Sequence, residues 1–172
     1  MEHYSYTFCG AKEYDVNVFP LLDAIFMETL ADPEGHYFIA VDEAVTNALH
    51  YGKQGADAEK VVVEVRLTES DITTVVLSDS RPFDVLLFRD KMRRIAENPQ
   101  LAEMPWGEYT SCTQRSRGYW LMLQACEYLY LDVSGKRVSL VQRIPCLSDY
   151  VSRDKIKHLV PRFFVEKGGV IV

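Results

Sequence analysis

The feature that most constrains how this chain can fold is the run at positions 39–52, IAVDEAVTNALHYG. At about 100° per residue, its spacing predicts an amphipathic helix. The apolar residues of this helix, with the phenylalanine before it, share one arc: Phe38, Val41, Val45, Ala48 and Leu49. A stripe of this width can lie on a sheet, so we expect a layered fold built around this helix.

The opposite side of the same helix carries Glu43, Asn47 and His50, at positions i, i+4 and i+7. Few charges surround this row, whereas a solvated helix face normally carries more Lys and Glu. A carboxylate one turn before a carboxamide suits Mg²⁺–phosphate chemistry, because the amide oxygen can ligate the metal and the carboxylate can orient a water or hydroxyl. The alternative interpretation is an ordinary helix with a polar outer face.

Composition narrows the classes of function. The chain has 172 residues, enough for one domain, and a net charge of −6, which argues against nucleic acid as the main partner. The N-terminus shows neither a basic region nor an apolar core, and no apolar run approaches the roughly 18–20 residues that cross a bilayer. We therefore expect a cytoplasmic protein without a membrane partner. The four cysteines are scattered and form no CxxC pair, so we expect reduced thiols and no zinc site. They are Cys9, Cys112, Cys126 and Cys146.

The rest of the chain predicts alternating strands and helices. Strands are expected at 4–9, in a hairpin at 61–67 and 72–77, and in a second hairpin at 128–133 and 137–143. Helices are expected at 17–30, 85–98 and 119–127. Residues 53–60 and 101–117 show no regular pattern, and a loop as long as the second is usually a lid, a binding loop or disordered. In the tail, a short helix is expected at 153–160. We expect the tail either to pack on the domain or to add an edge strand to the sheet.

Two further places offer polar groups to a ligand. Asp79 follows the strand at 72–77, where it can accept a hydrogen bond from a ligand amine; an Asp–Ser turn is the alternative. Arg115 and Arg117 precede Gly118 at a predicted helix start, where they would suit an anion. Solvated arginines in a loop are the alternative there.

The residues Glu43-x-x-x-Asn47-Ala48, followed by Tyr51 and Gly52, resemble the N box of the histidine-kinase-like (GHKL) ATPases. The fuller string DEAVTNALHYG is closest to the bacterial anti-sigma-factor serine/threonine kinases of that superfamily. The order of motifs and elements follows the family over about residues 4–144.

Two more motifs carry the resemblance, each with a departure. Asp79, Pro82, Phe83 and Asp84 resemble the G1 box, Asp-x-Gly-x-Pro-Phe-Asp, but its glycine is missing. Gly118 begins a segment that resembles the G2 box, Gly-x-Gly-Leu-x-Leu, in which Trp120 replaces the second glycine. The stretch before Gly118 corresponds to the ATP lid.

The resemblance implies an α/β two-layer sandwich, with a mixed, mainly antiparallel sheet covered on one face by helices. It implies an ATPase domain at 1–144 and a C-terminal extension at 145–172. ATP and Mg²⁺ are the implied cofactors, with Glu43 as catalytic base and Asn47 as the Mg²⁺ ligand. The implied nucleotide contacts are Asn47, Tyr51, Asp79, Phe83, Arg115, Arg117 and Gly118.

The function implied by the resemblance is a partner switch in transcription regulation. Such a kinase binds a sigma factor and phosphorylates a small anti-anti-sigma antagonist, usually as a homodimer. The alternative is a non-catalytic partner-binding module with weak or no nucleotide binding. The Glu43–Asn47 pair favours the kinase, and the G1 and G2 departures favour the module.

The side chain of Trp120 bears on this choice. If it points into the core, the amides at the helix start remain available to phosphates; if it points into the pocket, it occupies phosphate space. The missing G1 glycine favours weakened binding. On that basis, Trp120→Gly is expected to tighten Mg-ATP binding by roughly tenfold.

Overall fold

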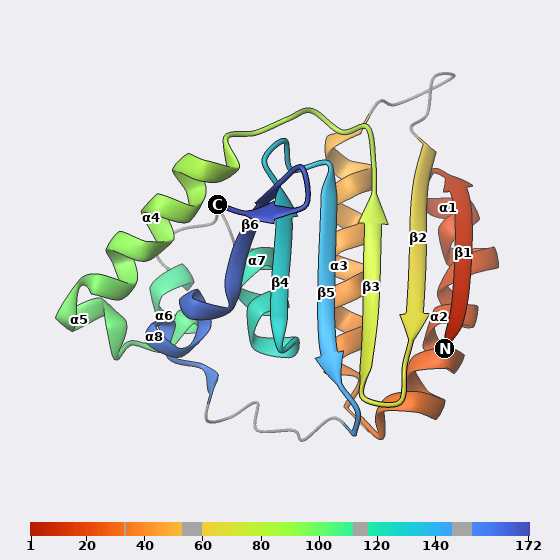
Figure 1. The fold of residues 1–172 in the computed structure, drawn as a ribbon, viewed down its shortest axis with the longest axis horizontal. Helices are drawn as coiled ribbons and strands as arrows, with labels where there is room; N and C mark the ends of the chain where they lie inside the picture. Colours follow the sequence, from red (N-terminus) through yellow and green to blue (C-terminus); the bar gives the residue numbers. More distant parts are fainter. Residues whose placement is uncertain (33, 53–59, 112–116, 146–152) are drawn as a thin grey trace.

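The computed structural model describes residues 1–32, 34–52, 60–111, 117–145 and 153–172. Within those ranges the strands form one seven-stranded sheet, mixed but mostly antiparallel. Figure 1 shows the helices α2, α3 and α7 on the same face of this sheet. The predicted fold, a sheet covered by helices in a two-layer sandwich, is confirmed.

The elements follow one another along the chain in an order close to the predicted one. They are β1 (Glu2–Cys9), α1 (Ala11–Glu13), a π-helical turn (Tyr14–Val18), α2 (Phe19–Leu30), α3 (His36–Tyr51), β2 (Lys60–Leu67), β3 (Asp71–Leu77), α4 (Val85–Glu97), α5 (Pro99–Ala102), α6 (Trp106–Ser111), α7 (Arg117–Ala125), β4 (Tyr128–Asp132), β5 (Arg137–Arg143), α8 (Ile156–Leu159), a 3₁₀ turn (Val160–Arg162), β6 (Phe163–Lys167) and β7 (Val170–Ile171).

The sheet has the order β1-β2-β3-β5-β4-β6-β7. Both predicted hairpins form, because β2 pairs antiparallel with β3 and β4 pairs antiparallel with β5. The C-terminal extension belongs to the same sheet: β6 lies parallel to β4, and β7 pairs with β6. Of the two alternatives for the tail, the added edge strand is therefore observed, together with the short helix α8.

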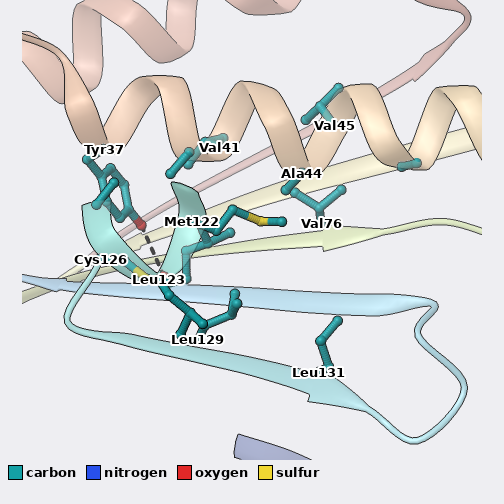
Figure 2. Close-up of a cluster of buried hydrophobic side chains, with 14 of the residues drawn as sticks. Tyr37, Val41, Ala44, Val45, Val76, Met122, Leu123, Cys126, Leu129 and Leu131 are labelled. Carbon is teal, nitrogen blue, oxygen red and sulfur yellow. Dashed lines mark hydrogen bonds between the residues drawn. The ribbon is translucent and has the colours of Figure 1, made fainter. Parts of the chain in front are cut away.

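The core lies between the sheet and the helices that cover it, with α3 and α7 at its centre and α2 and α4 contributing further buried residues. Figure 2 shows Val41 of α3 near Met122 of α7, and Ala44 and Val45 farther along α3, near Val76 of β3. Burying one such large apolar side chain contributes roughly 1.5–3 kcal/mol. The buried arc of α3 is shifted from the apolar stripe in the sequence: Phe38 and Leu49 are only partly buried, and both the sheet and α7 pack against this helix. Three residues outside the stripe are therefore also buried: Tyr37, Ala40 and Ala44.

One buried polar group in this core is fully supported. Tyr37 is completely buried, and its hydroxyl hydrogen-bonds to Thr74 Oγ1 and to the carbonyl oxygen of Leu140, each over 3.0 Å. Burial raises the pKa of this phenol. A buried hydroxyl costs free energy unless it is paired, so these bonds tie α3 to β3 and β5 at a defined position.

The interpretation of 101–117 as irregular is wrong for the described part of that stretch, which contains α6. The chain before it also differs from the prediction. Asn98 caps a new helix, α5, by accepting hydrogen bonds at Oδ1 from the backbone N–H groups of Gln100 and Leu101. Pro99 thus begins a helix rather than only ending one, as its fixed φ allows in a first turn.

None of the helices in the described ranges combines the length and the apolar composition that a bilayer crossing requires. The loop predicted at 53–60 lies outside those ranges, apart from Lys60, which begins β2.

Candidate functional site

Glu43 and Asn47 are brought together on α3, as their spacing predicts. Asn47 Nδ2 donates a hydrogen bond to Glu43 Oε1 over 3.3 Å, and both side chains are half-buried. His50, the third member of the predicted polar row, does not join them: it is exposed, and its ring lies 4.9 Å from that of Tyr51. The polar side of α3 is therefore divided into a covered pair and a solvated end.

Gly118 meets this pair from α7. A Cβ built on Gly118 would lie 2.1 Å from Glu43 Oε1 and 2.8 Å from Glu43 Cδ, so the carboxyl group packs directly on the glycine backbone. Only a residue without a side chain permits this approach. The first turn of a helix exposes N–H groups and a positive dipole end, which favour a negative charge. The carboxylate of Glu43 thus lies where α7 favours an anion.

Tyr119 connects the Glu43 pair to the segment that follows β3. Burial raises the pKa of its phenol, and the nearby Tyr51 and Glu43 raise it further. Its ring centroid lies 5.9 Å from that of Phe83 and 4.9 Å from that of Phe88. Sequence reasoning did not single out this residue. The available signal was its place directly after Gly118 in the G2-like segment.

Phe83 is held by the turn between β4 and β5. A Cβ built on Gly135 would lie 2.4 Å from Phe83 Cε1, and the φ of Gly135 is +74°, a conformation that favours glycine. The ring of Phe83 remains 37% exposed. Two motifs that are distant in the sequence, the G1-like segment and Gly118 with Tyr119, therefore meet through aromatic contacts.

Asp79 lies at the exposed end of β3, as predicted, but it has a partner within the chain. Its carboxylate forms an ion pair with Lys136 of the β4–β5 turn, and its side chain is 70% exposed. The backbone reinforces this contact, because the N–H of Ser78 donates to the carbonyl of Lys136 over 3.0 Å. Lys136 was not among the predicted site residues, since nothing in the sequence relates it to Asp79.

The segment after β3 is also tied to the end of α3. The backbone N–H of Arg81 donates to the carbonyl oxygen of Tyr51 over 3.3 Å. Tyr51 itself is 58% exposed. The end of the N-box helix and the G1-like segment are thus neighbours through this backbone bond, and Tyr119 lies near residues of both.

The two arginines of the predicted anion site have different outcomes. Arg117 is exposed and is the first residue of α7. Arg115 lies outside the described residues. Asp84, the last residue of the G1-like segment, serves as a helix cap: its Oδ1 accepts a hydrogen bond from the N–H of Leu87 over 2.8 Å at the start of α4.

Trp120 points into the core and away from the Glu43 pair. It is only 1% exposed, and its ring lies edge-on to Tyr109 with centroids 6.1 Å apart. The first of the two orientations considered for this side chain is therefore the correct one. The expectation that Trp120→Gly tightens Mg-ATP binding loses its basis, because the indole takes no space beside Glu43 or Gly118.

The described residues contain no group of three or more His, Cys, Asp or Glu side chains arranged to hold a metal ion. Mg²⁺ commonly binds through one or two protein oxygens plus waters and substrate phosphates. Asn47 can supply one such oxygen, since its Nδ2 is the atom turned toward Glu43. This donor set fits a Mg²⁺ ion that arrives with a nucleotide better than a site made of protein ligands alone.

Comparison of the sequence with protein-family models and with curated proteins returns no match. The functional interpretation therefore depends on the motifs and on the geometry described above.

Proposed function

We propose that this chain is an ATP-binding serine/threonine protein kinase of the anti-sigma type, acting as a partner switch in transcription regulation. The observation that carries the proposal is the packing of the Glu43 carboxylate, paired with Asn47, on the backbone of Gly118. A carboxylate, a carboxamide and a helix N-terminus at one point suit phosphoryl transfer, because they can accept a proton, ligate Mg²⁺ and bind phosphate oxygens.

In this proposal Glu43 accepts the proton of the attacking serine or threonine hydroxyl. The hydroxyl oxygen then bonds to the γ-phosphorus of ATP, the bond from that phosphorus to the β,γ-bridging oxygen breaks, and ADP leaves. Asn47 would hold Mg²⁺, which neutralises charge on the phosphate oxygens. The amides at the start of α7, with Arg117, would contact the phosphates.

The base of the nucleotide would be bound at the other end, by Asp79 and Phe83. Phe83 offers a partly exposed aromatic ring beside Tyr119. Asp79 offers a carboxylate to the adenine amine, provided that the ligand displaces Lys136. Tyr51 lies next to both segments through its backbone contact with Arg81.

The partners proposed for this kinase are a sigma factor and an anti-anti-sigma antagonist, in the cytoplasm, with a homodimer as the active unit. Support for these partners comes from the resemblance of the string DEAVTNALHYG to the anti-sigma kinases. The net charge of −6 is consistent with binding other proteins rather than nucleic acid.

A second candidate is a non-catalytic partner-binding module, and two observations favour it. The Asp79 carboxylate is already neutralised by Lys136. The largely buried phenol of Tyr119 is near enough to Glu43 for that carboxyl to raise its pKa, and its ring lies 5.9 Å from that of Phe83, so this side chain lies close to both ends of the proposed site. A module of this kind would keep the protein-binding surfaces and lose the nucleotide.

Calorimetric titration of the full chain with Mg-ATP separates the two candidates. The kinase requires saturable binding that disappears when Asn47→Ala is titrated; absence of binding by the unaltered chain supports the module. Asn17→Ala is a suitable control, because this amide is exposed in the π-helical turn before α2.

Phosphoryl transfer then tests the role of Glu43. With γ-labelled ATP and an anti-anti-sigma antagonist protein, Glu43→Gln should retain Mg-ATP binding and lose about 10²–10⁴-fold in transfer rate, the usual effect of removing a positioned base. Glu69→Gln, in the exposed turn between β2 and β3, should transfer at the unaltered rate. Full transfer by Glu43→Gln would exclude this carboxylate as the base.

A further inference from the structure

The C-terminal tail is joined to the α5–α6 segment, residues 99–111, by backbone hydrogen bonds. Pro105 and Lys155 form an antiparallel β-bridge. On one side of it the N–H of Ile156 donates to the carbonyl of Met104 over 3.2 Å, and on the other the N–H of Trp106 donates to the carbonyl of Asp154 over 2.9 Å. Figure 1 shows α8 beside α5 and α6, far along the sequence from both.

Charged side chains reinforce the same junction. Glu103 accepts hydrogen bonds from Lys157 and, over 3.2 Å, from Lys155. These two lysines hold the pKa of the Glu103 carboxyl below its usual range. Exposed ion pairs contribute little individually. Here, however, two lysines act on one carboxylate, so the two pairs add to the backbone bonds and to the burial of Ile156 and Leu159, both fully covered.

The α5–α6 segment is in turn attached to α7. Trp106 Nε1 donates to Gln124 Oε1 over 2.8 Å, and the ring of Tyr109 packs against that of Trp120. A second contact of the tail reaches the residues just after α7, where Arg153 pairs with Glu127 over 3.1 Å. The tail thus reaches α7 in two ways: through Glu127, which follows the end of the helix, and through α6, which packs on the helix itself.

We propose that residues 153–157 form a strap that holds the α5–α6 segment against α7 and so sets the position of α7 relative to α3. Trp106 and Lys155 are positioning residues in this strap: they act on Glu43 and Asn47 only through the place of α7, and neither contacts that pair directly. The predicted effect on nucleotide rests on the proposed function: displacement of α7 moves Gly118 away from Glu43 and weakens Mg-ATP binding.

Charge reversal tests the strap without removing any buried side chain. In Lys155→Glu/Lys157→Glu, the carboxylates that replace the two ammonium groups repel Glu103; adding Glu103→Lys restores opposite charges. Amide hydrogen exchange is measured on the full chain without nucleotide. The double variant should exchange about tenfold faster at Trp106, Ile156 and Leu121, and the triple variant should return to the original rates.

Arg66→Glu is the matched control. It reverses the charge of an exposed ion pair with Glu64 on β2, which lies towards the opposite edge of the sheet from the tail strands β6 and β7. It should leave the exchange at Trp106, Ile156 and Leu121 unchanged. Unchanged exchange at Trp106 and Ile156 in the double variant would overturn the strap. Faster exchange there with an unchanged rate at Leu121 in α7 would also overturn it, since the tail would then not position α7.

Trp106→Phe is a second variant, which keeps an aromatic ring and removes the indole N–H that bonds to Gln124. It should raise exchange at Leu121 and leave the Ile156 bond to Met104 in place. Mg-ATP titration of the same proteins tests the consequence: the double variant should bind about tenfold more weakly, and the triple should recover. If the unaltered chain does not bind Mg-ATP, the kinase proposal fails while the exchange rates still decide the strap.

Discussion

The two ends of the proposed nucleotide site are built in different ways. At the Glu43 end, the carboxyl, the amide of Asn47 and the backbone of Gly118 are set by the packing of α3 along α7. At the Asp79 end, the carboxylate is exposed and is held by a surface ion pair with Lys136. Packed helices determine positions more firmly than an exposed ion pair, which salt and side-chain entropy weaken. The first end is therefore preformed, and the second can change when a ligand binds.

The largest effect is expected from Trp120, which anchors α7 beneath the Glu43 end. Trp120→Ala removes a fully buried indole and should lower the free energy of unfolding by about 3–5 kcal/mol. Urea unfolding followed by circular dichroism measures this. Leu87→Ala on α4, where the side chain is 64% exposed, should change the same quantity by no more than about 0.5 kcal/mol. A loss below about 1 kcal/mol for Trp120→Ala would show that α7 is not anchored in this way.

Gly118 offers a sharper test of the same end. An added Cβ collides with the Glu43 carboxyl, which must turn away from Asn47, so Gly118→Ala should lower the free energy of unfolding by about 1 kcal/mol. Gly107→Ala, within α6, meets nothing within 4 Å and should stabilise the protein by about 0.5–1 kcal/mol.

A double-mutant cycle decides whether the effect at Gly118 passes through Glu43. The loss in Gly118→Ala should largely disappear when Glu43→Ala is already present, because the colliding carboxyl has been removed. Additive losses would mean that the two residues do not contact one another in solution.

At the other end, Asp79→Asn should change folding very little. Removing one charge of an exposed pair costs at most about 1 kcal/mol, so the melting temperature without ligand should hold. The increment in melting temperature on adding Mg-ATP should shrink, because a neutral amide has one acceptor oxygen instead of two and accepts more weakly than a carboxylate. An equal fall in both quantities would identify Asp79 as a turn residue, and the two ends would then not differ as described.

The smallest effect is expected at Tyr119, between the two ends. Its folded-state pKa is raised above the value of about 10 in an unfolded chain. The stability that this phenol contributes is therefore fully present below about pH 10 and is lost as the pH rises further. Between pH 9 and 10.5, the phenolate absorbance of the folded protein and of Tyr119→Phe should coincide. A missing phenolate in the variant would show that Tyr119 ionises normally and is open to solvent.

Several features of the protein followed from the sequence alone. The strands of both hairpins, the helix that carries Glu43 and Asn47, and the approach of these two side chains were predicted correctly. Each depends on contacts between neighbouring residues: alternation with period two, or a repeat of one helical turn. The exposed position of Asp79 followed in the same way, from its place directly after a β-branched strand.

Other features were decided only by the tertiary structure. The partner of Asp79, the direction of Trp120, the role of Tyr119 and the bridge from Lys155 to Pro105 all join segments that are far apart in the chain. The side on which a tryptophan is buried depends on which element packs against its helix, and no local pattern encodes that choice. The sequence by itself therefore determined most of the elements, though not α5 or α6, and one polar pair, whereas the packing of α7 between α3 and the tail decided what surrounds that pair.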